Sequence, residues 1–365
     1  MSIVYAKTQS PSPNNPYTSE FLDTFRDKGD PLADALIQTI LQERNSRGDL
    51  FWWLHQKART EGGIYQAFME HVHHPPEWVD FKKMALGAHA SLRFALHGGI
   101  ALLTASLIES YASSKVANIL VHTGRLTQDI NRRLFETAQF VLEVAKTGGA
   151  IPGSEAHRNV VRVRLMHAFV RNAMKRHPQW QEEWGLAFNQ EDYAGVLLTF
   201  SLVFSRSLQL LGVPLTSEEL ESIHHTWRYV GYVMGIDESL ITKDCADEKE
   251  LYIALTHRHY TPGEESRRLA HRLLETMAWQ QPFFLPPGAL FEISRKLIGD
   301  TLADQLAFKR FPFFEQRFPL LPKGTSLIHS FQQLPFMRGF AAWFGETLTK
   351  GILDFGLMGK SADFE

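Results

Sequence analysis

Apolar residues recur three and four positions apart along most of this chain, and no segment shows the alternation of a half-buried strand. Residues 31–44, for example, place apolar side chains at 32, 36, 37, 40 and 41. The same spacing continues through 78–96, 132–146 and 155–175. This pattern predicts an all-α fold.

Helix ends can also be read from the sequence. Thr216 and Glu219 are spaced as a capping box and begin a helix that Gly235 ends. The sequence Thr-Pro-Gly-Glu at 261–264 predicts the start of another helix, which runs to about Trp279.

A single helical domain is the expected organisation. The 365 residues have room for two or three domains, but no Gly/Ser-rich linker divides them. We expect residues 1–27 to be disordered or extended and residues 28–310 to form the helical domain. Residues 311–365, which follow a run of prolines that begins at 282, are expected to pack on that domain as a C-terminal extension.

Composition argues against several classes of function. The chain has 38 Lys and Arg against 40 Asp and Glu, so its charge indicates neither nucleic acid nor an anionic membrane as a partner. The apolar stretch from 96 to 121 is interrupted by polar residues and reads as a buried helix with a break near Ser113 and Ser114, rather than as a transmembrane segment. The N-terminus lacks the apolar core of a signal peptide. We expect a cytoplasmic location.

The strongest candidate for a functional residue is His167. It lies on an apolar helical face close to Arg162, Arg164 and Arg171. An imidazole for iron, apolar side chains for a macrocycle and guanidinium groups for propionates together suit a buried haem. A hydrogen-bonded core histidine is the alternative interpretation of the same pattern.

The helix predicted just before that of His167 carries a second group of candidate site residues. Arg133, Glu136, Thr137 and Phe140 share one face of the helix predicted at 132–146, and that face can line a pocket opposite His167. The alternative is an ordinary amphipathic helix in which Arg133 and Glu136 form a solvated pair.

Two features carry weaker signals. His224 and His225 lie in the helix that follows Thr216, where we expect one ring to pack inside and the other to face solvent. Cys245 is the only cysteine, so an intrachain disulfide is impossible. It lies between acidic residues, which gives no reason to expect an activated thiolate.

Several of these segments, taken in order, resemble the catalytic domain that latex clearing protein, a rubber oxygenase, shares with the MpaB oxygenase. The resemblance covers roughly residues 28 to 310. The matching pieces are residues 29–34 (GDPLAD), 76–80 (PEWVD), 133–137 (RLFET), 162–167 (RVRLMH), 189–192 (NQED), 199–200 (TF), 227–235 (WRYVGYVMG) and 297–300 (LIGD).

The resemblance implies a haem b protein with a globin-like helical core. By similarity, His167 is the proximal iron ligand, and Arg164 is the family's arginine for haem binding or stability. Arg162 and Arg171 are further candidates for haem contacts. Arg133 and Thr137 fall on the distal side.

The chain departs from the family at two distal positions. The residue before the distal threonine is a lysine in rubber oxygenases and is Glu136 here. The glutamate proposed there as a catalytic base corresponds to Ala117. These departures do not affect the expected haem ligand, but they argue against polyisoprene as the substrate.

The expected function is a haem b-dependent oxygenase or oxidase. It would use dioxygen to attack an unsaturated lipid-like or isoprenoid molecule, and Arg133, Glu136 and Thr137 would be the catalytic residues. A non-catalytic haem protein that binds or senses a diatomic gas remains an alternative, as does a cofactor-free helical lipid-binding protein. The sequence does not identify the electron donor.

Overall fold

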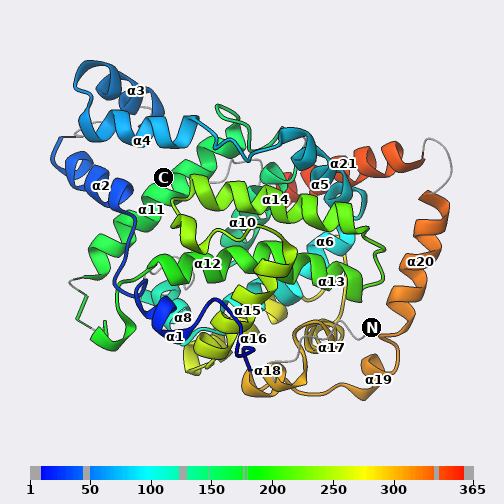
Figure 1. Cartoon of the computed structure of the whole chain (residues 1–365). Helices are drawn as coiled ribbons and strands as arrows, with labels where there is room; N and C mark the ends of the chain where they lie inside the picture. Colours follow the sequence, from blue (N-terminus) through cyan, green and yellow to red (C-terminus); the bar gives the residue numbers. More distant parts are fainter. Residues whose placement is uncertain are drawn as a thin grey trace.

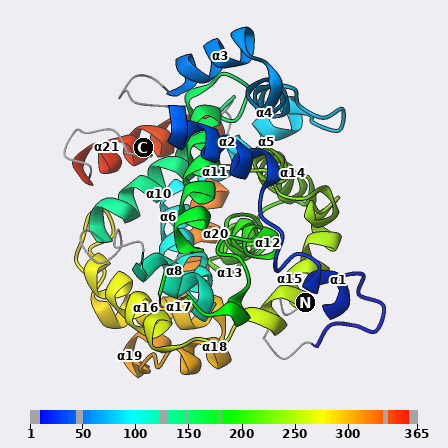
Figure 2. The ribbon, with the colours of Figure 1, turned by 90° about the vertical axis from the view of Figure 1, so that its left-hand side faces the viewer.

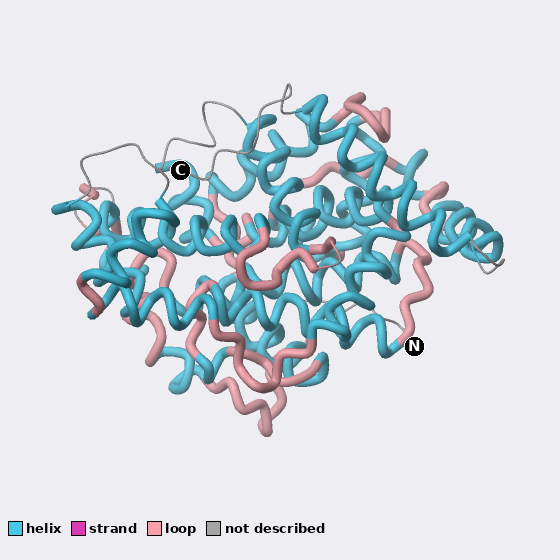
Figure 3. Tube along the Cα trace, turned by 90° about the horizontal axis from the view of Figure 1, so that it is seen from above, coloured by secondary structure: helices cyan, strands magenta, loops and turns pink. Residues whose placement is uncertain are grey.

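The computed structural model of the chain describes residues 10–43, 50–122, 130–146, 148–175, 177–178, 180–332 and 337–356. Helices and the turns between them make up this part of the molecule (Figure 3), and its one extended pairing is an isolated bridge between Ser113 and Tyr260. The all-α prediction is confirmed.

Most of the helices are short. In chain order they are α1 (Ser19–Asp23), α2 (Pro31–Glu43), α3 (Leu50–Thr60), α4 (Gly63–His73), α5 (Phe81–Arg93), α6 (Ala95–Ala101), the π-helical turn η1 (Leu102–Ser106), α7 (Leu107–Ser110), α8 (Ser114–His122), α10 (Ile130–Val144), α11 (Glu155–Met174), the 3₁₀ turn η2 (Glu182–Trp184), α12 (Gln190–Leu198), the π-helical turn η3 (Thr199–Val203), α13 (Phe204–Leu210), α14 (Ser217–Val233), the 3₁₀ turn η4 (Glu238–Leu240), α15 (Cys245–His259), α16 (Glu264–Met277), α17 (Pro287–Ile298), α18 (Asp300–Gln305), α19 (Pro312–Glu315), α20 (Leu320–Gln332) and α21 (Met337–Gly356).

Helices α11, α12 and α14 cross the middle of the molecule, and the remaining helices surround them (Figures 1 and 2). Helix α14 packs closely on α5, and the reason is visible at Gly87. A Cβ atom there would lie 2.7 Å from the backbone of Ser222, so only glycine allows this approach. The pair α5 and α14 thereby fixes the position of the residues that α14 sends inward.

Within residues 1–27, where a disordered or extended segment is expected, the structure describes a short helix. Residues 19–23 form α1, whose N-cap Thr18 accepts a hydrogen bond from the backbone N–H of Phe21. The side chains of Tyr17, Leu22 and Phe25 are buried in the core. Their hydrophobic burial holds this segment against the domain.

Several predicted helix ends are confirmed. Thr216 and Glu219 form a capping box at the start of α14, and Gly235 follows its end with φ of 76°. The prediction for 261–264 is partly wrong. Gly263, and not Thr261, is the N-cap of α16. Thr261 lies in the preceding loop, where its carbonyl oxygen accepts a hydrogen bond from the Ser114 hydroxyl.

The apolar stretch from 96 to 121 is broken near Ser113 as expected, between α7 and α8. The π-helical turn η1 within it was not expected. Helix Gln190–Leu210 is long and apolar enough to cross a membrane, but 61% of its most apolar window is buried inside the protein. The helix pair Phe81–Arg93 and Ala95–Ser110 passes the same test together and is bent by 87°.

The described part of the C-terminal segment packs on the helical domain. Helix α21 lies against α5 and α10, and a Cβ atom at Gly345 would lie 2.2 Å from the carbonyl oxygen of Leu92. The opposite face of α21 leaves Phe340, Trp343 and Phe344 about half exposed. This segment therefore contributes to the support of α10.

Candidate functional site

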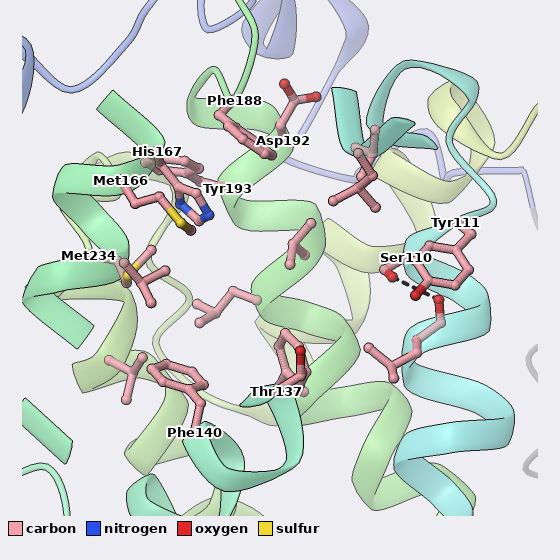
Figure 4. Close-up of a pocket in the computed structure, with 18 of the residues that line it drawn as sticks. Ser110, Tyr111, Thr137, Phe140, Met166, His167, Phe188, Asp192, Tyr193 and Met234 are labelled. Carbon is pink, nitrogen blue, oxygen red and sulfur yellow. Dashed lines mark hydrogen bonds between the residues drawn. The ribbon is translucent and has the colours of Figure 1, made fainter. Parts of the chain in front are cut away.

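A cavity of about 250 Å³ lies between α10, α11, α12 and α14, and its walls are mostly apolar (Figure 4). Helices α7 and α8 close another side, and Leu273 of α16 completes the lining. The residues that line it are Leu107, Ser110, Tyr111, Val116, Leu120, Leu134, Glu136, Thr137, Phe140, Val163, Met166, His167, Phe188, Asp192, Tyr193, Val196, Leu197, Phe200, Trp227, Val230, Met234, Ile236 and Leu273.

His167 lies in the wall formed by α11. Its ring centroid is 4.5 Å from that of Phe188 and 5.2 Å from that of Tyr193, so two aromatic rings flank the imidazole. Figure 4 shows His167, Met166, Phe188 and Tyr193 together at one end of the cavity, with Thr137 and Phe140 at the other. The predicted placement of His167 opposite the helix of Thr137 is therefore what the structure shows.

Arg171 does not line the cavity and instead donates hydrogen bonds to Phe188 and Tyr193, the two aromatic residues beside His167. Its Nη1 donates to the carbonyl oxygen of Phe188 at 2.6 Å and to the Tyr193 hydroxyl at 3.2 Å. Phe188 has φ of 48°, a left-handed conformation that costs on the order of 1 kcal/mol for a residue with a side chain. The hydrogen bond from Arg171 and the pairing of its Nη2 with Asp34 at 2.7 Å help to keep this turn in place.

Arg164 also points away from the cavity. Its Nε donates to Oδ2 of Asp30 at 2.6 Å, its Nη2 donates to Oδ1 of Asp30 at 2.9 Å, and its Nη1 donates to the carbonyl oxygen of Val233 at 3.0 Å. Both members of the ion pair are 1% exposed. Of the two roles expected for Arg164, haem binding or stability, these contacts correspond to stability.

Arg162 lies on the outer side of α11. It contacts Glu155 at 2.9 Å and donates to the side-chain oxygen of Asn159 at 2.6 Å. The guanidinium groups of Arg162, Arg164 and Arg171 are therefore paired with protein groups, and the expectation that they reach haem propionates is not borne out. Arg162 is five positions from His167 and lies on a different face of α11. Arg164 and Arg171 lie on the same side of the helix as His167, but their guanidinium groups are directed at Asp30 and Asp34.

The opposite wall carries the predicted distal residues. Glu136 and Thr137 of α10 line the cavity, and Glu136 is 4% exposed. Arg133 belongs to the first turns of α10, but its side chain lies outside the described residues. Helix α10 thus brings together two of the three residues that the sequence grouped.

A buried ion pair in the cavity wall was missed at the sequence level. Asp192 lines the cavity and lies 2.7 Å from the ammonium nitrogen of Lys115, and both side chains are no more than 10% exposed. Asp192 also completes a capping box with Asn189 at the start of α12. The spacing of Asn189 and Asp192 signals the cap, but the partner on α8 is 77 residues away in sequence and leaves no local signal.

A family model matches residues 86–321 of this chain, and its description is "ER-bound oxygenase mpaB/B'/Rubber oxygenase, catalytic domain". The match includes α10, α11, α12 and α14, which together form most of the cavity. The chain belongs to this oxygenase family. The expectation of an oxygenase enzyme from the MpaB and rubber oxygenase family is thereby confirmed.

Two known proteins extend the comparison beyond the family model. The rubber oxygenase of Streptomyces sp. (strain K30) is 22% identical over 315 residues, which cover 83% of this chain and 76% of that protein. The structure of latex clearing protein in the closed state aligns with a TM-score of 0.71 at 19% identity and covers 90% of both chains. This structural likeness concerns the fold.

The residues around the cavity fit the iron and the ring of a haem. His167 provides an imidazole at the wall, and the aliphatic and aromatic side chains provide an apolar enclosure. Among the described lining residues the carboxylic acids are Glu136 and Asp192, and none is a lysine or an arginine. The described wall therefore offers an axial ligand and apolar contacts, but no cation for the propionates.

Proposed function

We propose that this chain is a haem b-dependent oxygenase that acts with dioxygen on an unsaturated, isoprenoid-like substrate. The observation that carries the proposal is the position of His167, whose ring lies in one wall of an apolar cavity with Glu136 and Thr137 in another. Membership in an oxygenase family supports the same conclusion. Haem would supply the chemistry of dioxygen activation.

The chain's own residues have separate tasks in this proposal. His167 would hold the iron, while Phe188 and Tyr193 restrict the rotation of its ring. Thr137 can donate or accept a hydrogen bond at the other wall, and Glu136 can accept a proton there. The apolar side chains would exclude water and bind a hydrocarbon chain.

The glutamate at 136 separates this chain from rubber oxygenases, which by resemblance have a lysine at that position. A carboxylate and an ammonium group have opposite charges, so the field at the distal wall differs in sign. We therefore do not carry polyisoprene over as the substrate, and we infer another unsaturated isoprenoid or lipid-like molecule. The cytoplasmic location expected from the sequence remains a prediction.

The haem assignment is tested by replacing His167 with alanine. Wild-type protein produced with added haem should contain about one haem per chain, measured as the pyridine haemochrome, and His167→Ala should lose it. Met166→Leu alters the neighbouring cavity residue and provides the control, which should retain haem. Equal haem content and unchanged spectra in His167→Ala would refute the assignment.

The oxygenase reaction is tested with a matched pair of substrates. Squalene and its saturated analogue squalane share a carbon skeleton but differ in their double bonds. Under ¹⁸O₂, products from squalene should carry the label and squalane should remain unchanged. Haem-loaded protein that binds dioxygen but consumes none with any unsaturated isoprenoid would favour a gas-binding protein. A preparation that takes up no haem would favour a cofactor-free lipid-binding protein.

A further inference from the structure

Three side chains with metal-ligating atoms meet outside the cavity, where α14 and α15 approach each other. Glu221 and His224 belong to α14, and Cys245 is the first residue of α15. One ligating atom of each lies within 4.8 Å of those of the other two. We propose that Glu221, His224 and Cys245 bind a zinc ion that fastens the start of α15 to α14.

Helices α14 and α15 bring these three side chains together. Residues 221 and 224 are three positions apart and therefore lie on the same face of α14. The backbone N–H of Cys245 donates to Oε1 of Glu221 at 3.2 Å, which brings the first turn of α15 to that face. Two of the groups come from α14 and one from α15, so a shared ion would tie the two helices together.

The ligand types match zinc. Zinc takes thiolate, imidazole and carboxylate ligands in tetrahedral sites, and three protein ligands leave the fourth position for water. One thiolate and one carboxylate neutralise the two charges of the ion, since a neutral imidazole adds none. When zinc binds, the Cys245 thiol proton is released to solvent.

The ring of His224 is buried and held in a fixed orientation. It is 3% exposed, and its Nε2 lies 2.9 Å from the Thr242 hydroxyl oxygen, a contact that fixes the orientation of the ring. The expectation that one of the two neighbouring histidines faces solvent is wrong, because His225 is also buried at 5% exposure.

In the absence of a metal ion, Cys245 is a neutral thiol rather than a thiolate. A cysteine in the first turn of a helix ordinarily has a lowered thiol pKa. Here burial, and then the charges of Glu248 and Glu221, raise the pKa of the thiol far above its usual value. The expectation that Cys245 is not an activated thiolate agrees with this shift, and a bound dication would reverse it.

Zinc binding to the purified, untagged full-length protein tests the proposal. After treatment with a chelator, wild type should take up one zinc ion per chain, with affinity measured by competition against a chromophoric chelator. Cys245→Ser and Glu221→Gln should each weaken binding at least tenfold. Glu218→Gln removes an exposed carboxylate from the same helix and should stay within twofold of wild type.

Two further measurements keep the result independent of folding and of haem. Far-ultraviolet circular dichroism should show the same helix content in the variants, and zinc should raise the melting temperature of wild type but not that of Cys245→Ser. His167→Ala should bind zinc as wild type does, so failure of the haem assignment leaves this result intact. The proposal is overturned if wild type takes up no zinc, or if Cys245→Ser and Glu221→Gln bind it within twofold of wild type.

Discussion

Arg164 and Asp30 form a two-contact ion pair between α11 and the residue that caps α2, with both side chains 1% exposed. Asp30 also accepts a hydrogen bond from the backbone N–H of Ala33 at 3.1 Å, within the first turn of α2. The pair lies beside Gly235, where a Cβ atom would be 2.5 Å from Asp30 and 2.6 Å from Arg164. A single buried contact thus joins α2, α11 and the end of α14.

Breaking this pair should destabilise the whole domain. Arg164→Met leaves the Asp30 carboxylate buried without its partner, and we expect a loss of about 3–5 kcal/mol in the free energy of unfolding. Urea denaturation followed by circular dichroism measures it. The double variant with Asp30→Asn should recover part of the loss, because the uncompensated charge is removed. A loss below about 1 kcal/mol in Arg164→Met would contradict the role assigned to the pair.

Arg171→Met should cost less stability and have a more local effect. Its partner Asp34 keeps 29% of its side chain exposed, so water can solvate the remaining carboxylate. The variant loses the donor to Phe188 and Tyr193, and the ring of His167 becomes less restricted. In haem-loaded protein we expect altered absorption bands with helix content preserved. Arg162→Met, on the outer side of α11, is the control and should leave both unchanged.

Glu136→Gln should raise the reduction potential of the haem-loaded protein. A carboxylate near the iron stabilises the more positive ferric state, and the amide removes that charge. A screened interaction on the order of 1 kcal/mol corresponds to roughly 40 mV for a one-electron couple. Spectroelectrochemical titration of both proteins measures the shift. An unchanged or lower potential would remove Glu136 from the distal site.

Stability should decrease in mild acid because of buried histidines. Burial lowers the pKa of His157 to about 4, and its Nε2 lies 2.6 Å from the carbonyl oxygen of Val72. Between pH 6.5 and 4 the unfolded chain binds a proton that the folded chain does not, so acid favours unfolding. His157 alone accounts for roughly 1.5 kcal/mol between pH 6.5 and 5. Urea midpoints at several pH values should therefore fall with pH, and His157→Gln should show a shallower slope.

The sequence predicts the helices of this protein better than it predicts the partners of their charged residues. Helix α11 was expected at 155–175 and runs over Glu155–Met174, because its spacing and the preceding glycines are local signals. Arg164 and Arg171 of α11 pair with Asp30 and Asp34, more than 130 residues away. Nothing local in the sequence distinguishes a guanidinium that faces a carboxylate from one that faces a ligand.

The residues of the cavity wall likewise divide into those that local periodicity predicts and those that it does not. His167 and the face of α10 were predicted because each lies within one helix whose periodicity is readable. The contributions of Phe188 and Lys115 depend on a left-handed turn and on the approach of α8 to α12, respectively. These are tertiary relationships, and a single sequence carries no local pattern for them.

The π-helical turns η1 and η3 lie against each other beside the cavity, and each holds one residue more than an α-helical turn of the same course. An α-helix advances about 100° per residue, so loss of one residue from η1 would rotate Ser110 and Tyr111 away from the cavity. Loss of one residue from η3 would likewise change how α12 and α13 are aligned. The number of residues in these two turns is therefore constrained. A substitution there alters one contact, whereas deletion of a single residue would rearrange a whole wall of the cavity.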